Sequence, residues 1–305
     1  MLKNNKVKAS RLKKWYKRDL LSWVFIMPMI AVMYLAIWRP TVIGGFWSFF
    51  KMNGYRPGKF IGLENYRLVL SNSQFLPTLK NTVMYVFWSL IIGFIPPLIV
   101  AVMINEMVRF KNTLRTLIYL PAVIPGIAAM MIWSRIYDPS NLGLLNMILT
   151  KLGFGTFAWL DDSRFTIIGI VIYATWSGFA GTMLLYYSTL QGVSAELYEA
   201  ALIDGAGPLR RVRYVTLPQM AGIILLNLVR QIIAVFQILE QPLAMTDGGP
   251  NGASASLAYQ LYLYGFKSSG QRTGQAMALG VIIFLILMVM TCFYFYANRK
   301  VEENF

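Results

Sequence analysis

The sequence contains no histidine and only one cysteine, Cys292. A disulfide within the chain is therefore excluded, as are zinc sites made of cysteine and histidine and acid–base catalysis by histidine. Acidic residues are also scarce, with 13 Asp and Glu against 28 Lys and Arg. No nucleophile with a partner base stands out among the remaining residues, so we expect no enzymatic activity and no cofactor in this chain.

The sequence also lacks a glycine-rich loop that ends in Gly-Lys-Ser or Gly-Lys-Thr. Such a loop holds the phosphates of a nucleotide on its backbone amides, and an ATPase of that type requires it. Any energy that this chain uses must therefore come from a partner chain or from an ion gradient.

Hydrophobic residues make up 57% of the chain, and the mean hydropathy is +0.54. This composition is too apolar for an ordinary soluble domain and is typical of a membrane protein. The formal net charge of +15 could indicate nucleic-acid binding. In a membrane chain, however, basic residues usually mark cytoplasmic flanks and contact anionic lipid, so we expect membrane lipid and no nucleic acid as a partner.

Several apolar segments have about the length that crosses a bilayer. They predict an all-α bundle of six transmembrane helices, at Leu20–Trp38, Thr82–Ile104, Leu114–Tyr137, Thr166–Leu190, Leu217–Leu239 and Gln275–Ala297. The chain then divides into a basic tail at 1–19, a membrane domain at 20–297 and a short tail at 298–305. A cleaved signal peptide is the alternative for the first segment, but the apolar run is long and no small-residue cleavage site follows it.

Proline and glycine interrupt the second and third predicted spans, at Gly93, Pro96 and Pro97 and again at Pro121, Pro125 and Gly126. Each interruption frees backbone groups that neighbouring helices or water must satisfy, which predicts bent helices. Residues 1–18 carry eight Lys and Arg and no acid. By the positive-inside rule we expect both termini, and the connection between the fourth and fifth spans, in the cytoplasm.

That connection, at 195–218, is a short polar segment between two long apolar ones. Ser194 can cap a helix whose apolar stripe stops at Asp204. Gly205 can adopt backbone angles that other residues avoid, and Pro208 suits the first position of a new helix. The segment therefore predicts a helix, a break and a second helix.

Its residues also carry a resemblance to a known family. Glu199-Ala200-Ala201, then Gly205, and finally Leu217-Pro218 resemble the EAA signature of permease subunits of ATP-binding-cassette importers that depend on a binding protein. Val215 stands where the family usually has isoleucine. An ordinary cytoplasmic loop is the alternative interpretation of this segment.

The resemblance implies the transmembrane fold of a type I importer. The implied partners are a second homologous permease, an ATPase dimer that uses ATP and magnesium, and an extracytoplasmic solute-binding protein. In this family the segment docks on the ATPase as a coupling helix, and the residues implied in that role are Glu199, Ala200, Ala201, Asp204, Gly205, Leu217 and Pro218.

Outer segments point to the carbohydrate branch of the family. Phe60–Tyr66 resembles an FxGLxNY element, while 246–250 with its Gly-Gly-Pro, 257–262 and 274–276 resemble the loop before the last span. They make the chain similar to the membrane subunits of maltose importers and imply an oligosaccharide substrate and a bacterial cell membrane. A non-sugar solute is the alternative. An ion-coupled transporter would need carboxylates near the midplane, but all Asp and Glu lie outside the spans or at their ends.

Polar side chains of the fifth span fall within one arc of roughly 120° at about 100° per residue. Because polar groups in lipid are costly, they should face the bundle interior or an aqueous path. Together with aromatic residues of the fourth span they form the predicted substrate pathway, which comprises Tyr173, Trp176, Asn227, Arg230, Gln231 and Gln237. Hydrogen bonding between helices is an equally weighted alternative for this stripe.

Overall fold

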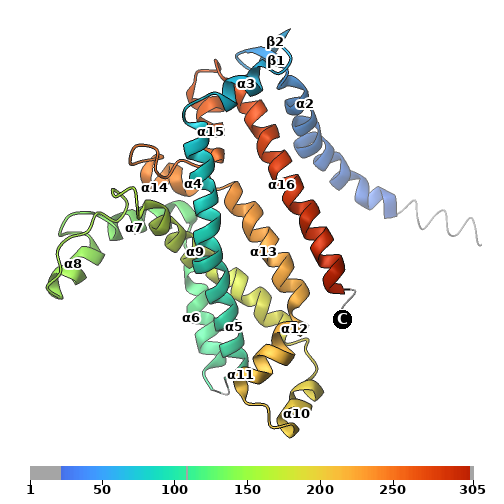
Figure 1. Cartoon of the computed structure of the whole chain (residues 1–305), viewed down its shortest axis with the longest axis vertical. Helices are drawn as coiled ribbons and strands as arrows, with labels where there is room; N and C mark the ends of the chain where they lie inside the picture. The colour runs from blue at the N-terminus through green and yellow to red at the C-terminus, as the bar shows by residue number, and fades with distance from the viewer. Residues whose placement is uncertain (1–21, 108, 303–305) are drawn as a thin grey trace, which may run out of the picture.

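The computed structural model describes residues 22–107 and 109–302, and within them it is mostly helical (Figure 1). The predicted all-α fold is confirmed, while the basic tail at 1–19 lies outside the described residues. After the first span the helical elements are α3 Glu64–Leu70, α4 Phe75–Trp88, η2 Ser89–Phe94, α5 Ile95–Glu106, α6 Lys111–Val123, α7 Gly126–Ile136, α8 Leu144–Lys151, α9 Thr166–Leu190, α10 Ala195–Ile203, α11 Pro208–Arg211, η3 Val212–Thr216, α12 Leu217–Gln219, α13 Ala221–Phe236, α14 Glu240–Thr246, α15 Leu257–Tyr262, η4 Leu263–Lys267 and α16 Thr273–Glu302. Elements named η are π-helical turns.

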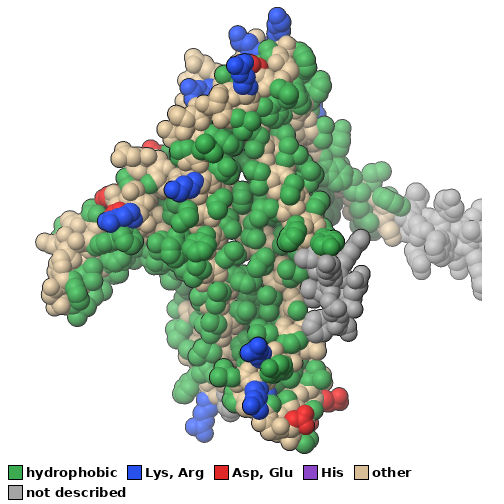
Figure 2. Space-filling model, viewed as in Figure 1, with side chains coloured by type: hydrophobic (Ala, Val, Ile, Leu, Met, Phe, Trp, Pro, Cys, Tyr) green, Lys and Arg blue, Asp and Glu red, His purple; other side chains and the backbone are tan. Residues whose placement is uncertain are grey.

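Four of the described helices are long and apolar enough to cross a membrane, and two bent pairs raise that number to six if each pair is one span. Figure 2 shows hydrophobic side chains over most of the length of the molecule, with Lys and Arg near its two ends and on the part that projects to the left. This distribution is the one expected of a chain whose middle is surrounded by lipid.

The first span is longer than predicted. One helix runs over Ser22–Trp47 and includes η1 Tyr34–Trp38 and α2 Arg39–Trp47. In η1 the backbone N–H of Arg39 bonds to Tyr34 O, five residues back, and this wider turn accommodates Pro40 without a break in the helix. The helix stands beside the bundle in Figure 1, and its side chains are mostly exposed.

The second span also passes through its prolines. α4, η2 and α5 form one continuous helix over Phe75–Glu106, with the π-helical turn at the position of Gly93. Pro96 and Pro97 follow in the first turn of α5. The interruption predicted for this span is therefore a local change from α-helical to π-helical turns within one helix.

The third predicted span, Leu114–Tyr137, is bent, as its proline and glycine residues predicted. Its two halves, α6 and α7, meet at 96°. Ile124 is extended (φ −75°, ψ 129°), as a residue before proline favours, and Pro125 then caps α7. α7 consequently leaves the bundle sideways and leads into an arm formed by residues 138–165 (Figure 1).

The fourth span has its predicted bounds, since α9 covers Thr166–Leu190. The fifth span is not one straight helix from Leu217, because the helices over Pro208–Gln219 and Ala221–Phe236 meet at 71°. The long axis of this span therefore starts at Ala221. The sixth, α16, extends past the predicted end at Ala297 to Glu302.

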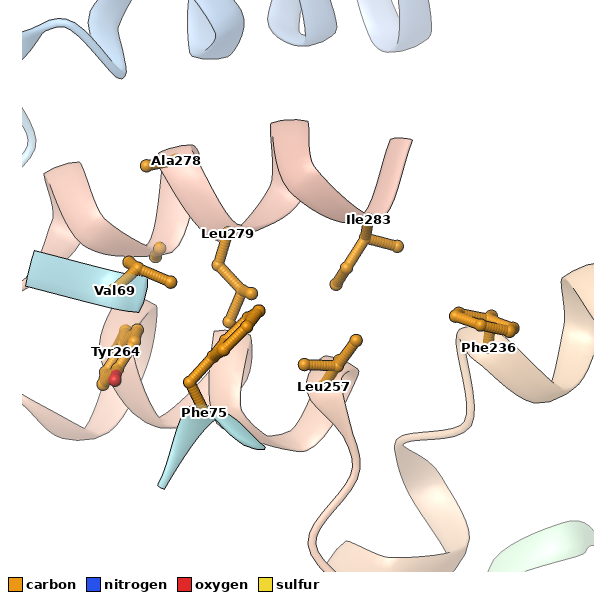
Figure 3. Close-up of a cluster of buried hydrophobic side chains, with 9 residues drawn as sticks. Val69, Phe75, Phe236, Leu257, Tyr264, Ala278, Leu279 and Ile283 are labelled. Atoms are coloured by element: carbon orange, nitrogen blue, oxygen red, sulfur yellow. The ribbon is translucent and has the colours of Figure 1, made fainter. Parts of the chain in front are cut away.

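A hydrophobic core joins α4, α13, α15 and α16 at the upper end of the molecule in Figure 1 (Figure 3). Phe75, Leu257 and Leu279 lie together at its centre, and Phe236 closes it at the end of α13. Leu257 and Leu279 are completely buried. Burying a side chain of this size contributes about 1.5–3 kcal/mol, so this cluster fixes these ends of the helices relative to one another.

The same end of the molecule is also held by two polar clamps. Next to the hairpin of β1 Phe50–Asn53 and β2 Arg56–Phe60, the amide of Asn65 donates to Ser48 O (2.7 Å) and Phe50 O (2.9 Å). A Cβ at Gly274 would lie 2.8 Å from that amide, so only glycine fits there. The FxGLxNY element thus anchors the hairpin to the start of α16.

The second clamp lies in the Gly-Gly-Pro loop. Gly248 has φ +78°, and a Cβ there would lie 2.6 Å from the ring of Tyr259. The Tyr259 hydroxyl donates to Asp247 O (2.8 Å). Burial raises the pKa of Tyr259 to about 12, so this hydroxyl remains protonated and available as a donor.

Candidate coupling loop and translocation path

The predicted helix–break–helix at 195–218 is present and projects from one end of the bundle (Figure 1). Ser194 caps α10, as predicted, by accepting a hydrogen bond from Glu196 N at 3.3 Å. α10 ends in a Schellman motif, in which Ala206 N bonds to Ala201 O (2.8 Å) and Gly205 N to Leu202 O (3.0 Å). Gly205 occupies the left-handed position of that motif, with φ +71°. Its role in the signature is therefore to reverse the chain after α10.

The second half of the loop packs back onto the first. Pro208 starts α11, as predicted, and the chain continues through η3 into Leu217 and Pro218 of α12. The hydroxyls of Tyr198 and Thr216 are 3.1 Å apart, and Thr216 is buried. The loop is thus a braced unit with a defined shape.

The predicted coupling residues lie on the outside of this unit. Glu199, Ala200, Asp204 and Gly205 are exposed, whereas Ala201 and Pro218 are half-buried; Leu217 is also exposed. Two apolar residues that the sequence analysis did not single out are the most accessible, Ile203 at 87% and Leu209 at 86%. Exposed apolar side chains beside small ones are typical of a surface that binds another protein.

Two contacts attach this loop to the carboxyl end of the second span. An Arg211 Nη2 lies 3.1 Å from Glu106 Oε2. At the start of the loop, Gln191 Nε2 donates to Asn105 Oδ1 at 2.7 Å. Adjacent residues of α5 therefore hold both ends of the loop, and neither contact was predicted, because each joins positions far apart in the sequence.

The predicted pathway residues of α13 lie on different sides of this helix. Leu226, Arg230, Ala234 and Gln237 form the exposed side. Arg230 has no ion-pair partner among the described residues. Asn227 is buried and its amide donates to Tyr186 of α9 at 2.7 Å. Asn227 therefore bonds between two helices, as the alternative interpretation of the stripe predicted.

The depth of the polar residues of this span is counted from Ala221, because α13 starts there and not at Leu217. At about 1.5 Å per residue Asn227 lies roughly 9 Å along the helix axis, and Gln231 lies roughly 15 Å along it, half the thickness of a bilayer core. Gln231 is thus the polar residue of this helix nearest to mid-membrane depth.

Gln231 lies between two hollows. One is a small cavity of about 70 Å³, whose polar lining comes from Ser89, Thr175, Thr182 and Gln231. The other is an open hollow of about 450 Å³, lined by Gln231, Gln237, Glu240 and Gln241 with apolar neighbours. A Cβ at Gly93 would lie 3.0 Å from Gln231 Nε2 and 3.2 Å from Thr175 Oγ1, so that glycine permits the close approach of both side chains.

The sequence analysis missed the hydroxyls and Glu240 as lining residues. Ser89 and Thr175 are inconspicuous within apolar spans, and Glu240 lies at the first turn of α14, after the helix that carries the stripe. Amide, hydroxyl and carboxylate groups are the hydrogen-bonding groups that suit a hydroxylated solute.

Tyr173 and Trp176 lie apart from these hollows. The Tyr173 hydroxyl donates to Gly126 O at 3.2 Å, and its ring packs beside Trp133 at 6.0 Å between centroids. Trp176 contacts the same Trp133 ring at 5.4 Å. These aromatic residues attach α7 to α9, so the structure gives them a packing position and does not bring them together with Gln231.

Comparison with known proteins shows to which family this chain belongs. Residues 93–303 match the family described as "Binding-protein-dependent transport system inner membrane component", and this match includes the coupling loop and α13. The chain belongs to this family. It is therefore a membrane component of a binding-protein-dependent transport system, and members of the family are importer permease subunits without an ATPase site of their own.

Two relatives align over nearly the whole chain. The trehalose/maltose transport system permease protein MalF of Thermococcus litoralis is 31% identical over 95% of this chain and 97% of its own length. The arabinooligosaccharides transport system permease protein AraP of Bacillus subtilis is 29% identical over 91% of this chain and 88% of its own length. The predicted resemblance to sugar-importer permeases is confirmed.

A solved structure confirms the fold of this permease. A chain of a bacterial ABC transporter involved in the import of the acidic polysaccharide alginate superimposes with a TM-score of 0.83. The match covers 95% of this permease and 99% of that chain, at 23% sequence identity.

Proposed function

We propose that this permease forms, together with a second homologous permease, the path by which a neutral oligosaccharide crosses the cell membrane. The observation that carries the proposal is the coupling loop, a braced and exposed unit at one end of a membrane bundle that has a polar hollow at mid-depth. The named substrates of the two relatives, trehalose or maltose and arabinooligosaccharides, support a sugar.

The coupling loop is the proposed docking site for an ATPase dimer, which would supply ATP hydrolysis with magnesium. Glu199 is exposed on α10 and available to pair with a cation of that partner, while Ala200 allows close helix approach. Ile203 and Leu209 add apolar area that association would bury. In this arrangement the loop and both termini face the cytoplasm of a bacterial cell, and an extracytoplasmic binding protein delivers the sugar at the opposite end.

The proposed path follows Gln231, Gln237 and the exposed side of α13. Arg230 lies on that side and would find water or a group of the second permease as its partner. The carboxylate of Glu240 in the open hollow favours a neutral or weakly charged solute over an anion, and among the described residues no cation lines that hollow. Amide and carboxylate groups can bond the hydroxyls of such a sugar.

Purification from the native membrane tests the assembly. With an affinity tag on the carboxyl end, we expect the permease to be recovered with an ATPase subunit and a second permease. Recovery of the intact chain without any ATPase subunit would overturn the importer proposal. The ligand that raises the thermal stability of the cognate binding protein tests the substrate class, and stabilisation by an amino acid or by phosphate, with no response to oligosaccharides, would contradict a sugar.

Gln231 and Asn227 should respond differently to substitution by alanine. Gln231→Ala is expected to lower uptake while complex recovery stays normal, because it removes a hydrogen-bonding group from the hollow. Asn227→Ala is expected to lower recovery, since it leaves the buried Tyr186 hydroxyl without its partner, at about 1–3 kcal/mol. The measurement is uptake in parallel with the yield of intact complex.

Gln271→Ala, on an exposed outer turn, provides the matched control for loss of a glutamine. Normal uptake in the Gln231 variant would remove this residue from the path and leave it with a packing role.

A further inference from the structure

The arm of residues 138–165 carries an apolar helix face that nothing in the described chain covers. On α8 and just after it, Leu144, Met147, Ile148 and Leu152 are exposed at the spacing of one helix face. Leu142 before the helix and Phe154 after it are exposed as well. This hydrophobic face therefore points away from the protein.

A buried asparagine fixes the orientation of α8. Asn146 lies on the opposite side of the helix with no exposed surface. Its Oδ1 accepts from Phe157 N and Trp159 Nε1, each at 3.0 Å, and its Nδ2 lies 3.0 Å from Phe157 O. These bonds tie the helix to the strand-like return of the arm, so α8 cannot rotate to bury its apolar face.

The place of the arm in the chain sets its height relative to the membrane. It connects the end of α7 to Thr166, the first residue of α9, which is a span of 25 residues. At about 1.5 Å per residue that helix is roughly 37 Å long, against roughly 30 Å of hydrocarbon, so the chain leaves the lipid core close to Thr166. The arm therefore lies at the level of the lipid headgroups.

The surface of the arm is two-sided. Figure 2 shows hydrophobic side chains along its underside, which faces the membrane-embedded half of the molecule, and charged side chains on its upper side. Lys151 lies on the exposed face of α8, where its stem can follow the apolar surface and its ammonium can reach phosphate groups. A short helix with this division is the type that lies in a membrane interface.

We propose that α8 is an interfacial helix whose Leu144, Ile148 and Leu152 face lies in the outer lipid leaflet beside the bundle. The proposal rests on the orientation given under the proposed function. The helix would hold α7, and through it the aromatic contacts of Trp133, at a fixed height while the spans move.

Nitroxide labelling of the full complex in lipid nanodiscs tests this. The single cysteine, Cys292, is first replaced by serine, and a label is placed at Ile148 or, as control, at Thr150, which is exposed off the apolar face. We expect the Ile148 label to collide severalfold more often with oxygen, which concentrates in lipid, than with a water-soluble nickel chelate. The Thr150 label should show the reverse preference.

Two results would overturn the proposal. The Ile148 label could be as accessible to the nickel chelate as the Thr150 label, which would place the face in water. It could also be shielded from both reagents and crosslink to the second permease, which would make the face a protein interface. Uptake by the same labelled variants reports separately on importer function, so a failure of that function is distinguishable from a wrong position of α8.

Discussion

Replacing Gly205 with valine is expected to abolish most coupled uptake while the chain still inserts into the membrane. Gly205 has φ +71°, in the left-handed region, and no neighbouring atom lies within 4 Å of a Cβ at this position. The effect therefore comes from the backbone and not from a clash. Left-handed geometry costs a non-glycine residue about 1–2 kcal/mol, and a β-branched residue more, which corresponds to a factor of about 5 to 30 in the population of the native loop.

The expected loss of uptake follows from the two helices that Gly205 orients. Its Schellman turn sets the angle between α10, with Glu199, and α11, with Leu209. A changed angle separates the two halves of the proposed ATPase surface. The measurements are uptake into vesicles and the amount of ATPase subunit recovered with the tagged permease.

Two variants of the same loop serve as controls. Gly207 has φ −66° and equally free space around a Cβ, so Gly207→Val should retain uptake. Gly205→Asn should retain more uptake than Gly205→Val, because asparagine tolerates the left-handed region. If uptake and ATPase recovery both survive Gly205→Val, the assignment of this loop to coupling is wrong.

Features set by neighbouring residues were predictable from the sequence. Ser194, Gly205 and Pro208 have the cap, turn and helix-start positions that their chemistry favours, and α9 has its predicted bounds, because all of these depend on contacts within a few residues. The π-helical turn at Gly93 was not predictable, since proline and glycine are compatible either with a kink or with such a turn.

Features set by distant residues could not be predicted from one span alone. The arc of polar residues on α13 was recognised, but which edge of the arc is buried depends on Tyr186 in another helix. The bend at Met220 was likewise not predicted, and it places the start of the straight helix at Ala221. The same limit applies to the anchoring of the coupling loop, whose partners lie in α5.

Reversing the charge of Glu106 is the second change with a large expected effect. Arg211 Nη2 and Glu106 Oε2 are 3.1 Å apart, and the Arg211 side chain is 16% exposed against 37% for Glu106. The Arg211 Nε is buried and has no hydrogen-bond partner among the described residues, so the guanidinium depends on this carboxylate. Glu106→Arg would place two cations together at a partly buried site, which is strongly unfavourable.

This ion pair connects the coupling loop to a span that reaches the proposed path. α5 continues through η2 into α4, and η2 carries Ser89 and Gly93 beside Gln231. A movement of the loop on the ATPase can therefore reach the lining of the hollow through one continuous helix. Coupling free energies between sites are typically 1–3 kcal/mol, so Glu106→Arg and Arg211→Glu are each expected to lower uptake by about 5- to 150-fold.

The double exchange of Glu106→Arg with Arg211→Glu separates the ion pair from a general effect of charge. It restores opposite charges across the same gap, so uptake should recover to well above that of either single variant. Arg210→Glu is the matched control, because Arg210 is exposed in the same helix and has no ion-pair partner among the described residues. ATP hydrolysis measured alongside uptake shows whether the single variants hydrolyse ATP without transport, as a broken link between loop and span requires. If the double exchange fails to recover uptake and Arg210→Glu is equally harmful, the arginines act on the ATPase surface directly and the contact with α5 transmits nothing.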